Sequence, residues 1–364
     1  GNCVACHTKP GGQPHAGGLK FDTPFGVLYS TNITPDRATG IGSWSPIWYK
    51  TQPEIAKVTR VCSFDRASYG FSDPPPRPLI VADVVNDLRA TLQAAQIPGP
   101  YVLVGHSLGG IEVLDALIDR ALGDGAVRGV IITSGKKDFA GGMDLQVIAQ
   151  MQTGGAAAIF AGVMRLHALL RKIERSGMDA KSLTGGKPIV AALTGTGLGI
   201  GYELPLACHR IFVADNPKAK IGLPEILVGL FPGAGGTTRL VRKLGLQGAA
   251  PYLLEGKLLG PHQAAAERLI DEVVAPEMLL ARAKAWVLAA KDADLVKPWD
   301  QKGYKMPGGA PYEPAGYMTY LAASAMTSAK TQGVYPAAQA VLQAAYEGAL
   351  VGFDTALKVE ARSF

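Results

Sequence analysis

The sequence lacks several features that mark specialised classes of protein. Its 364 residues include only four cysteines, two of them in one local motif, which does not suggest a disulfide framework. No run of about 18 apolar residues occurs, so a membrane-spanning helix is not expected. Charged residues are 18% of the chain, and the net charge of +6 is scattered, which argues against a nucleic-acid partner. With 48% hydrophobic residues, the composition predicts a globular protein of about two domains.

A strand, a glycine turn and a helix are indicated twice in the central part of the chain. Residues 189–201 join an apolar run to a glycine cluster, and a helix-capable segment with Glu203 follows. A second apolar run at 211–214 leads to Glu225 and then to the glycine-rich turn 233–236. We expect this repeat to bring both carboxylates and several free backbone N–H groups to one place. Two such glutamates can act as an acid/base pair, and free N–H groups at a helix start can bind an oxyanion.

Four motifs in this region resemble those of the crotonase (enoyl-CoA hydratase) superfamily. They are Ser-Gly-Lys-Lys-Asp-Phe-Ala-Gly-Gly-Met-Asp at 134–144, Gly-Ile-Gly-Tyr-Glu at 199–203, Gly-Leu-Pro-Glu at 222–225 and Pro-Gly-Ala-Gly-Gly at 232–236. Their order and spacing resemble in particular the hydratase part of the multifunctional fatty-acid β-oxidation α subunit. The resemblance covers about 111–364.

The resemblance implies a role for particular residues in hydrating an α,β-unsaturated thioester. Glu203 would orient and activate the water, and Glu225 would supply the α proton. The backbone N–H groups of Met143 and Ile200 would form the oxyanion hole. Ile200 stands where the family normally has glycine, and its β-branched side chain is expected to crowd that turn.

The resemblance also carries expectations about ligands, assembly and location. An acyl-CoA would be the substrate, the hydratase would need no cofactor, and the location would be cytoplasmic. The oligomeric state stays open, since crotonases usually assemble as trimers or larger complexes. Within the family, double-bond isomerisation is a sister activity that can run with Glu225 alone.

The first stretch, 1–45, carries a different signal. Cys3, Cys6 and His7 form C-x-x-C-H, a spacing that lets two thiols attach haem c while the histidine ligates the iron. With its surrounding glycine and proline turns, the stretch resembles the cytochrome c subunits of membrane-bound alcohol and sugar dehydrogenases. The axial methionine usual in that family is missing, because the next methionine is Met143. Electron transfer through haem c is therefore an alternative function, with a periplasmic location.

The second stretch, 46–110, resembles α/β-hydrolases of the lipase/esterase type. A buried strand is predicted at 101–105 and runs into Gly-His-Ser-Leu-Gly-Gly, which places Ser107 in the G-x-S-x-G pattern of a nucleophile elbow. A serine hydrolase also needs a histidine base and an acid, and in this family both follow the serine in the sequence. After Gly110 the sequence resembles a different family, so the expected acid and histidine are not indicated there. Serine hydrolysis at Ser107 is an alternative function.

Together these signals predict an α/β protein: a crotonase-like ββα spiral with C-terminal helices, preceded by an irregular N-terminal third that holds cytochrome c and α/β-hydrolase fragments. The expected parts are 1–45, 46–110, a hydratase core at 111–292, and a helical extension at 293–364 of the kind that precedes a dehydrogenase domain. An inactive chimera is the remaining alternative. Helices are expected over 81–95, 156–175, 247–255, 261–268, 276–291 and most of 331–364.

Overall fold

The structure is a computed structural model, and it describes part of the chain. The described residues are 20–23, 26–29, the helical positions 86, 88, 90, 93 and 94, and the ranges 108–143 and 155–364. The chain divides into two compact units, Gly1–Leu117 and Ile118–Phe364. In the first unit, strands β1 (Lys20–Thr23) and β2 (Gly26–Tyr29) form an antiparallel hairpin, and the helical positions between 86 and 94 agree with the helix expected there.

Helix α4 (Leu108–Gly123) crosses the point where the sequence changes family. The apolar spacing after Gly110 predicts a helix, but the helix begins earlier, at the residue directly after Ser107. It then continues without a break into the second unit, where Ile118 is buried.

The second unit is built on a parallel sheet. Its strands are β3 (Val130–Thr133), β4 (Ile189–Leu193), β6 (Arg210–Ala214) and β8 (Glu272–Val274), hydrogen-bonded in the order β3-β4-β6-β8. Every adjacent pair is parallel. Strand β4 is buried along its whole length, as its uninterrupted apolar sequence predicts for a strand covered on both faces.

A second, smaller sheet gives the fold its spiral character. Strands β5 (Gly197–Leu198) and β7 (Ile221–Gly222) pair in parallel, and Ala140 adds a single parallel bridge to Gly197. The chain thus passes through a large-sheet strand, a small-sheet segment and a helix, and repeats this order. The helices of the successive turns are α6 (Gly155–Arg175), α7 (Ile200–Ala207) and α8 (Gly236–Leu254). The expected crotonase-like ββα fold is therefore confirmed.

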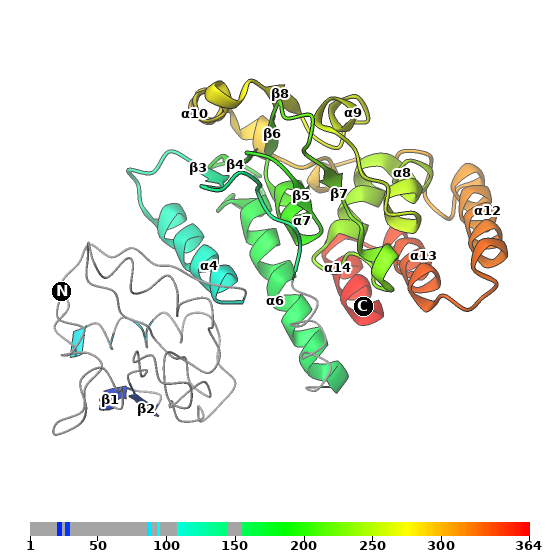
Figure 1. Cartoon of the computed structure of the whole chain (residues 1–364), viewed down its shortest axis with the longest axis horizontal. Helices are drawn as coiled ribbons and strands as arrows, with labels where there is room; N and C mark the ends of the chain where they lie inside the picture. Colours follow the sequence, from blue (N-terminus) through cyan, green and yellow to red (C-terminus); the bar gives the residue numbers. More distant parts are fainter. Residues whose placement is uncertain are drawn as a thin grey trace. The chain divides into compact units, whose positions relative to one another are not determined.

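Helices pack on both faces of the large sheet (Figure 1). On one face, α10 (Leu279–Ala289) buries its apolar side against β4, β6 and β8. The residues of this cluster are Val190, Ala192, Phe212, Ala214, Val274, Leu279, Ala283 and Val287. Helices α6 and α7 lie on the opposite side of the sheet in Figure 1. The alternation of strand side chains explains this division, since successive residues point to opposite faces.

The remaining helices connect and cover this core. The short elements are η2 (Glu225–Val228), α9 (Pro261–Ala266), η3 (Pro276–Met278), α11 (Asp292–Leu295) and η4 (Pro298–Asp300). Helices α12 (Pro314–Thr331), α13 (Pro336–Ala349) and α14 (Phe353–Ser363) form the C-terminal group. The expected helix at 247–255 is only the second half of α8, which begins at Gly236 and kinks at Gly245. Helix α12 lies within the helical extension expected at 293–364, although its own bounds were not predicted.

A buried ion pair joins α6 to α8. Glu174 accepts two hydrogen bonds from Arg239, both of 3.1 Å, and both side chains are fully buried. Arg171 adds a third bond to the same carboxylate at 2.9 Å and also pairs with Asp300. This pairing fixes the start of α8 relative to α6. No helix in the described part of the chain is long and apolar enough to cross a membrane.

Candidate active site

Glu203 lies in the first turn of α7, where the preceding glycine cluster turns the chain into the helix. Its side chain is only 3% exposed. Its Oε1 accepts hydrogen bonds from the backbone N–H groups of Ala234 and Gly236, both at 2.8 Å. These amides are at the start of α8, where N–H groups have no partner inside the helix and the helix dipole favours a negative charge. Oε2 receives no hydrogen bond from the described residues, so it is free to act on a ligand.

Glu225 is the first residue of η2, directly after the Gly-Leu-Pro turn. Its Oε2 is buried and has no hydrogen-bond partner among the described residues. Its Oε1 lies against Gly199, where a methyl group would come within 2.8 Å of it. Gly199 has a φ of 56°, and its carbonyl accepts the N–H of Glu203 at 2.9 Å. Glu203 and Glu225 therefore both lie against Gly199, Glu203 through its backbone N–H and Glu225 through its side chain.

The two segments expected to form the oxyanion hole lie next to each other. The loop that contains Met143 runs beside β5, where Leu198 donates its N–H to the Ala140 carbonyl at 2.9 Å. A methyl group on Gly199 would lie 3.5 Å from the Cα of Gly142. In the ranges that the structure describes, the N–H groups of Met143 and Ile200 have no acceptor. Ile200 forms the first residue of α7.

Burial governs the protonation of the two glutamates. It raises the pKa of Glu203 well above the usual range, with the negative charges of Glu225 and Glu360 acting in the same direction. It also raises the pKa of Glu225, to about 7. The two carboxyls interact, so they titrate as a pair, and over part of the pH range the pair holds one proton. Two amide hydrogen bonds favour the ionised form of Glu203, while the unpartnered oxygen of Glu225 favours the protonated form, so we assign the shared proton to Glu225.

A third buried glutamate, Glu360 on α14, was missed by the sequence analysis. It is fully buried, and it accepts hydrogen bonds from the N–H groups of Gly235 and Thr238 at 2.6 and 2.8 Å. No motif marks it. A signal was present, however: Glu360 lies on the same helical face as the apolar residues Ala356 and Leu357, a place where an ionisable residue is rare unless it is paired.

The other predicted site residues lie outside the described residues. These are Cys3, Cys6, His7 and Ser107. Within the described ranges, no group of three His, Cys, Asp or Glu side chains could hold a metal ion.

The three histidines that follow Ser107 in the sequence each have a local partner. His167 is 2.7 Å from the Gly233 carbonyl, and His262 is 3.0 Å from Asp215. His209 bonds to the backbone of Ile189, and burial lowers its pKa to about 4. Each ring thus has a partner within the second unit.

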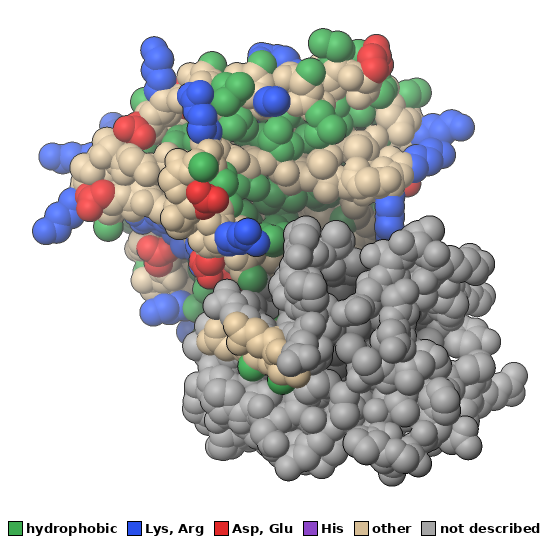
Figure 2. All heavy atoms as spheres, turned by 90° about the vertical axis from the view of Figure 1, so that its left-hand side faces the viewer, with side chains coloured by type: hydrophobic (Ala, Val, Ile, Leu, Met, Phe, Trp, Pro, Cys, Tyr) green, Lys and Arg blue, Asp and Glu red, His purple; other side chains and the backbone are tan. Residues whose placement is uncertain are grey.

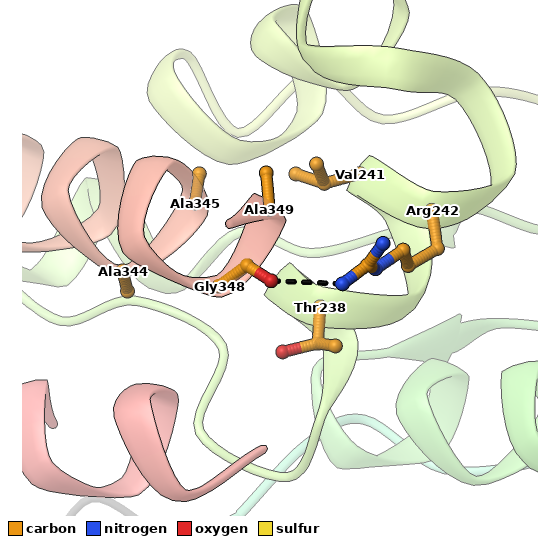
Figure 3. A pocket seen from close by; sticks show the side chains of 7 residues that line it. All are labelled: Thr238, Val241, Arg242, Ala344, Ala345, Gly348 and Ala349. Carbon is orange, nitrogen blue, oxygen red and sulfur yellow. Dashed lines mark hydrogen bonds between the residues drawn. The ribbon is translucent and has the colours of Figure 1, made fainter. Parts of the chain in front are cut away.

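A small recess lies between α8 and α13 (Figure 3). It is lined by Thr238, Val241, Arg242, Ala344, Ala345, Gly348 and Ala349. Arg242 reaches across it and donates to the Gly348 carbonyl at 2.8 Å. Thr238 donates its hydroxyl to Glu360 at 2.6 Å. Both polar side chains are thus engaged within the protein, so the recess belongs to the packing of the two helices.

The sequence profile described as "Enoyl-CoA hydratase/isomerase" matches residues 111–294, half of the chain. The chain belongs to this family. The match begins where the crotonase resemblance was expected to begin, and it contains both glutamates.

The chain is also similar to curated relatives and to solved structures. "Fatty acid oxidation complex subunit alpha" of Shewanella sp. (strain MR-4) is 34% identical over 66% of this chain, but over only 32% of its own length. The same subunit of Shewanella amazonensis is 33% identical over 79% of this chain and 37% of its own. The chain thus spans about a third of the length of these relatives. A crystal structure of enoyl-CoA hydratase from Bacillus anthracis covers 71% of this chain and 80% of its own, with 24% identity and a TM-score of 0.44.

A second profile, described as "alpha/beta hydrolase fold", matches residues 38–162. This confirms the hydrolase-like resemblance and extends it beyond the expected span of 46–110. The two matched regions overlap at 111–162, which contains most of α4, so the change of family is not sharp in the sequence.

Gly236→Ala is expected to displace the carboxylate of Glu203. A methyl group at this position would lie 2.7 Å from Oε1 and 2.9 Å from Cγ of Glu203, with Pro232 at 3.0 Å on another side. Forcing extra volume into such a site typically costs about 1–3 kcal/mol. Urea unfolding followed by circular dichroism measures this cost. Gly260→Ala is the matched control, since a methyl group there meets nothing within 4 Å; equal stability of the two variants would contradict the close packing.

Proposed function

We propose that the chain hydrates trans-2-enoyl-CoA thioesters to 3-hydroxyacyl-CoA. One observation carries the proposal: a glutamate held by two helix-start amides interacts with a second glutamate that has an unpartnered oxygen. This arrangement supplies an ionised and a protonated carboxyl side by side, which the addition of water to a double bond requires.

In the proposed reaction, Glu203 orients the water and takes a proton from it as its oxygen attacks the β carbon. Glu225 gives its proton to the α carbon. Water is thereby added across the double bond, and the proton of the pair moves from Glu225 to Glu203. Exchange with solvent then restores the starting state.

The negative charge that develops on the thioester oxygen would be stabilised by the N–H groups of Met143 and Ile200. Removing a donor of this kind from an oxyanion hole typically costs about 3–4 kcal/mol. The lack of an acceptor for either group among the described residues supports this role. No cofactor takes part in these steps.

Glu203→Gln and Glu225→Gln are each expected to lower kcat for crotonyl-CoA hydration by about 100-fold or more, because each removes one proton-transfer group. Loss of the enoyl-thioester absorbance measures the rate. Glu277→Gln, an exposed glutamate on η3, is the control. If Glu203→Gln kept the activity of the parent, hydration by this pair would be disproved. If it lost hydration but kept isomerisation of a 3-enoyl-CoA, the sister activity at Glu225 would be the function.

The pH dependence of kcat/KM follows from the protonation of Glu225. Burial raises its pKa to about 7, so the protonated acid is present below that pH and is lost above it. We therefore expect kcat/KM to fall on the alkaline side with an apparent pKa of about 7. Initial rates of crotonyl-CoA hydration between about pH 5.5 and pH 9.5 test this. A profile that stays flat throughout would argue against a glutamic acid as the proton donor.

Serine hydrolysis at Ser107 is a second candidate function. The hydrolase-fold match and the start of α4 directly after Ser107 favour it, since a nucleophile elbow joins a strand to a helix. The three histidines later in the chain have other partners, so we expect the protein to resist a fluorophosphonate probe. Labelling that disappears in Ser107→Ala would reverse this expectation.

The expected haem c site at Cys3, Cys6 and His7 remains a proposal. The test is to export the protein in cells that carry the haem-attachment machinery. Haem c bound at this motif would then give a Soret band, and a colourless protein would exclude it. We propose that the hydratase is located in the cytoplasm. If haem is attached at the C-x-x-C-H motif, the location would be the periplasm. The remaining proposals are a hydratase core at 111–292 joined to a helical extension at 293–364, an acyl-CoA substrate and a homo-oligomer.

A further inference from the structure

Two carboxylates from different parts of the chain share the N–H groups at the start of α8. Glu203 binds those of Ala234 and Gly236, and Glu360 binds those of Gly235 and Thr238. The hydroxyl of Thr238 adds a third bond to Glu360 at 2.6 Å. Donors to the two carboxylates alternate along the chain from 234 to 236, so moving one carboxylate shifts the amides that hold the other.

We propose that Glu360 is a positioning residue that clamps the start of α8, so that the N–H groups of Ala234 and Gly236 hold Glu203 in the orientation for water activation. This inference rests on the proposed hydratase function. It assigns part of the active-site geometry to α14, a helix of the C-terminal extension. Glu360 would not touch the substrate; it would act through the backbone of α8.

Helix α14 is anchored firmly enough to serve as such a clamp. Trp299 and Phe353 stack with ring centroids 5.2 Å apart, and Asp354 accepts a hydrogen bond from Arg171 on α6 at 2.7 Å. Ala356, Leu357 and Ala361 are buried around Glu360. These contacts fix α14 against η4 and against α6, the helix that the Glu174–Arg239 ion pair joins to α8.

The charge of Glu360 has no lysine or arginine partner within the described residues. The titratable groups that interact with it are His167 on α6, Glu203 on α7 and Glu225 at the start of η2. Arg239 is paired with Glu174, and Glu347 with Arg362 on α14. His167 lies 3.7 Å from Glu360 but has its Nε2 against the Gly233 carbonyl at 2.7 Å.

Glu360 acts electrostatically on both carboxyls of the pair. Burial is the first cause of the raised pKa of both Glu203 and Glu225, and the charge of Glu360 raises each further. Removing that charge lowers both pKa values. Glu360 thus has a second effect besides clamping α8. Its charge allows the pair to keep its shared proton up to a higher pH.

Glu360→Gln tests both effects, because glutamine keeps the shape and loses the charge. We expect kcat for crotonyl-CoA to fall about ten- to a hundredfold, with KM changed by less than about twofold, as for a displaced catalytic group. We also expect the apparent pKa of the alkaline limb of the pH profile to fall by about one unit. Glu347→Gln, a glutamate of α13 that bonds to Arg362 and Gln343, is the matched control and should change neither quantity.

A titration without substrate separates this inference from the hydratase proposal. Carbon-13 labelling of the glutamate side chains lets NMR follow the pair, with Glu203→Gln and Glu225→Gln assigning the signals. The signals should titrate about one pH unit lower in Glu360→Gln. An unchanged titration would overturn the electrostatic role, even if the parent hydrates crotonyl-CoA. A parent that hydrates nothing would overturn the hydratase proposal, while the titration would still decide whether Glu360 acts on the pair.

Thr238→Val provides a second test in case Glu360→Gln does not fold, which circular dichroism would reveal. Valine removes one of the three donors to Glu360 and leaves the charge in place. We expect kcat to fall severalfold with KM and the pH profile unchanged. An unchanged kcat would contradict the clamping role.

Discussion

The start of α8 is the constraint on which the site depends. A helix start leaves several N–H groups without partners, and burying them without acceptors would be costly. Here the acceptors are two glutamates, one from α7 and one from α14. The same bonds that complete the backbone of α8 also remove both carboxylates from water. Folding and proton affinity are thus consequences of a single arrangement.

The large sheet and the ion pair of Glu174 with Arg239 hold this arrangement in place. Strand β4 is covered on both faces, and the glycine cluster that follows it directs the chain into α7 with Glu203 in its first turn. The ion pair fixes the start of α8 from the other side. Each glutamate is therefore positioned by rigid elements, which an acid/base pair needs because small displacements slow proton transfer markedly.

The sequence predicted those parts of the fold whose signals are local. Apolar β-branched runs marked β4 and β6, and the glycine motifs marked the turns that bring Glu203 and Glu225 together. The start of α8 was missed because glycines and threonines at 235–238 are weak helix formers, and tertiary contacts with the two glutamates outweigh that preference. Glu360 was missed for a related reason: its partners lie more than 120 residues away, and no local pattern reports such a contact.

Helix α4 has a practical consequence for dividing this chain. The family resemblance would place a cut at Ile111, yet that residue lies within the first turn of a helix that begins at Leu108. A protein shortened there would lose the residues that start the helix and would put a charged amino terminus where the positive end of the helix dipole lies, an unfavourable combination. The border between the two sequence families thus lies inside a single helix, α4. The start of the family match and the start of the helix are different residues in this chain.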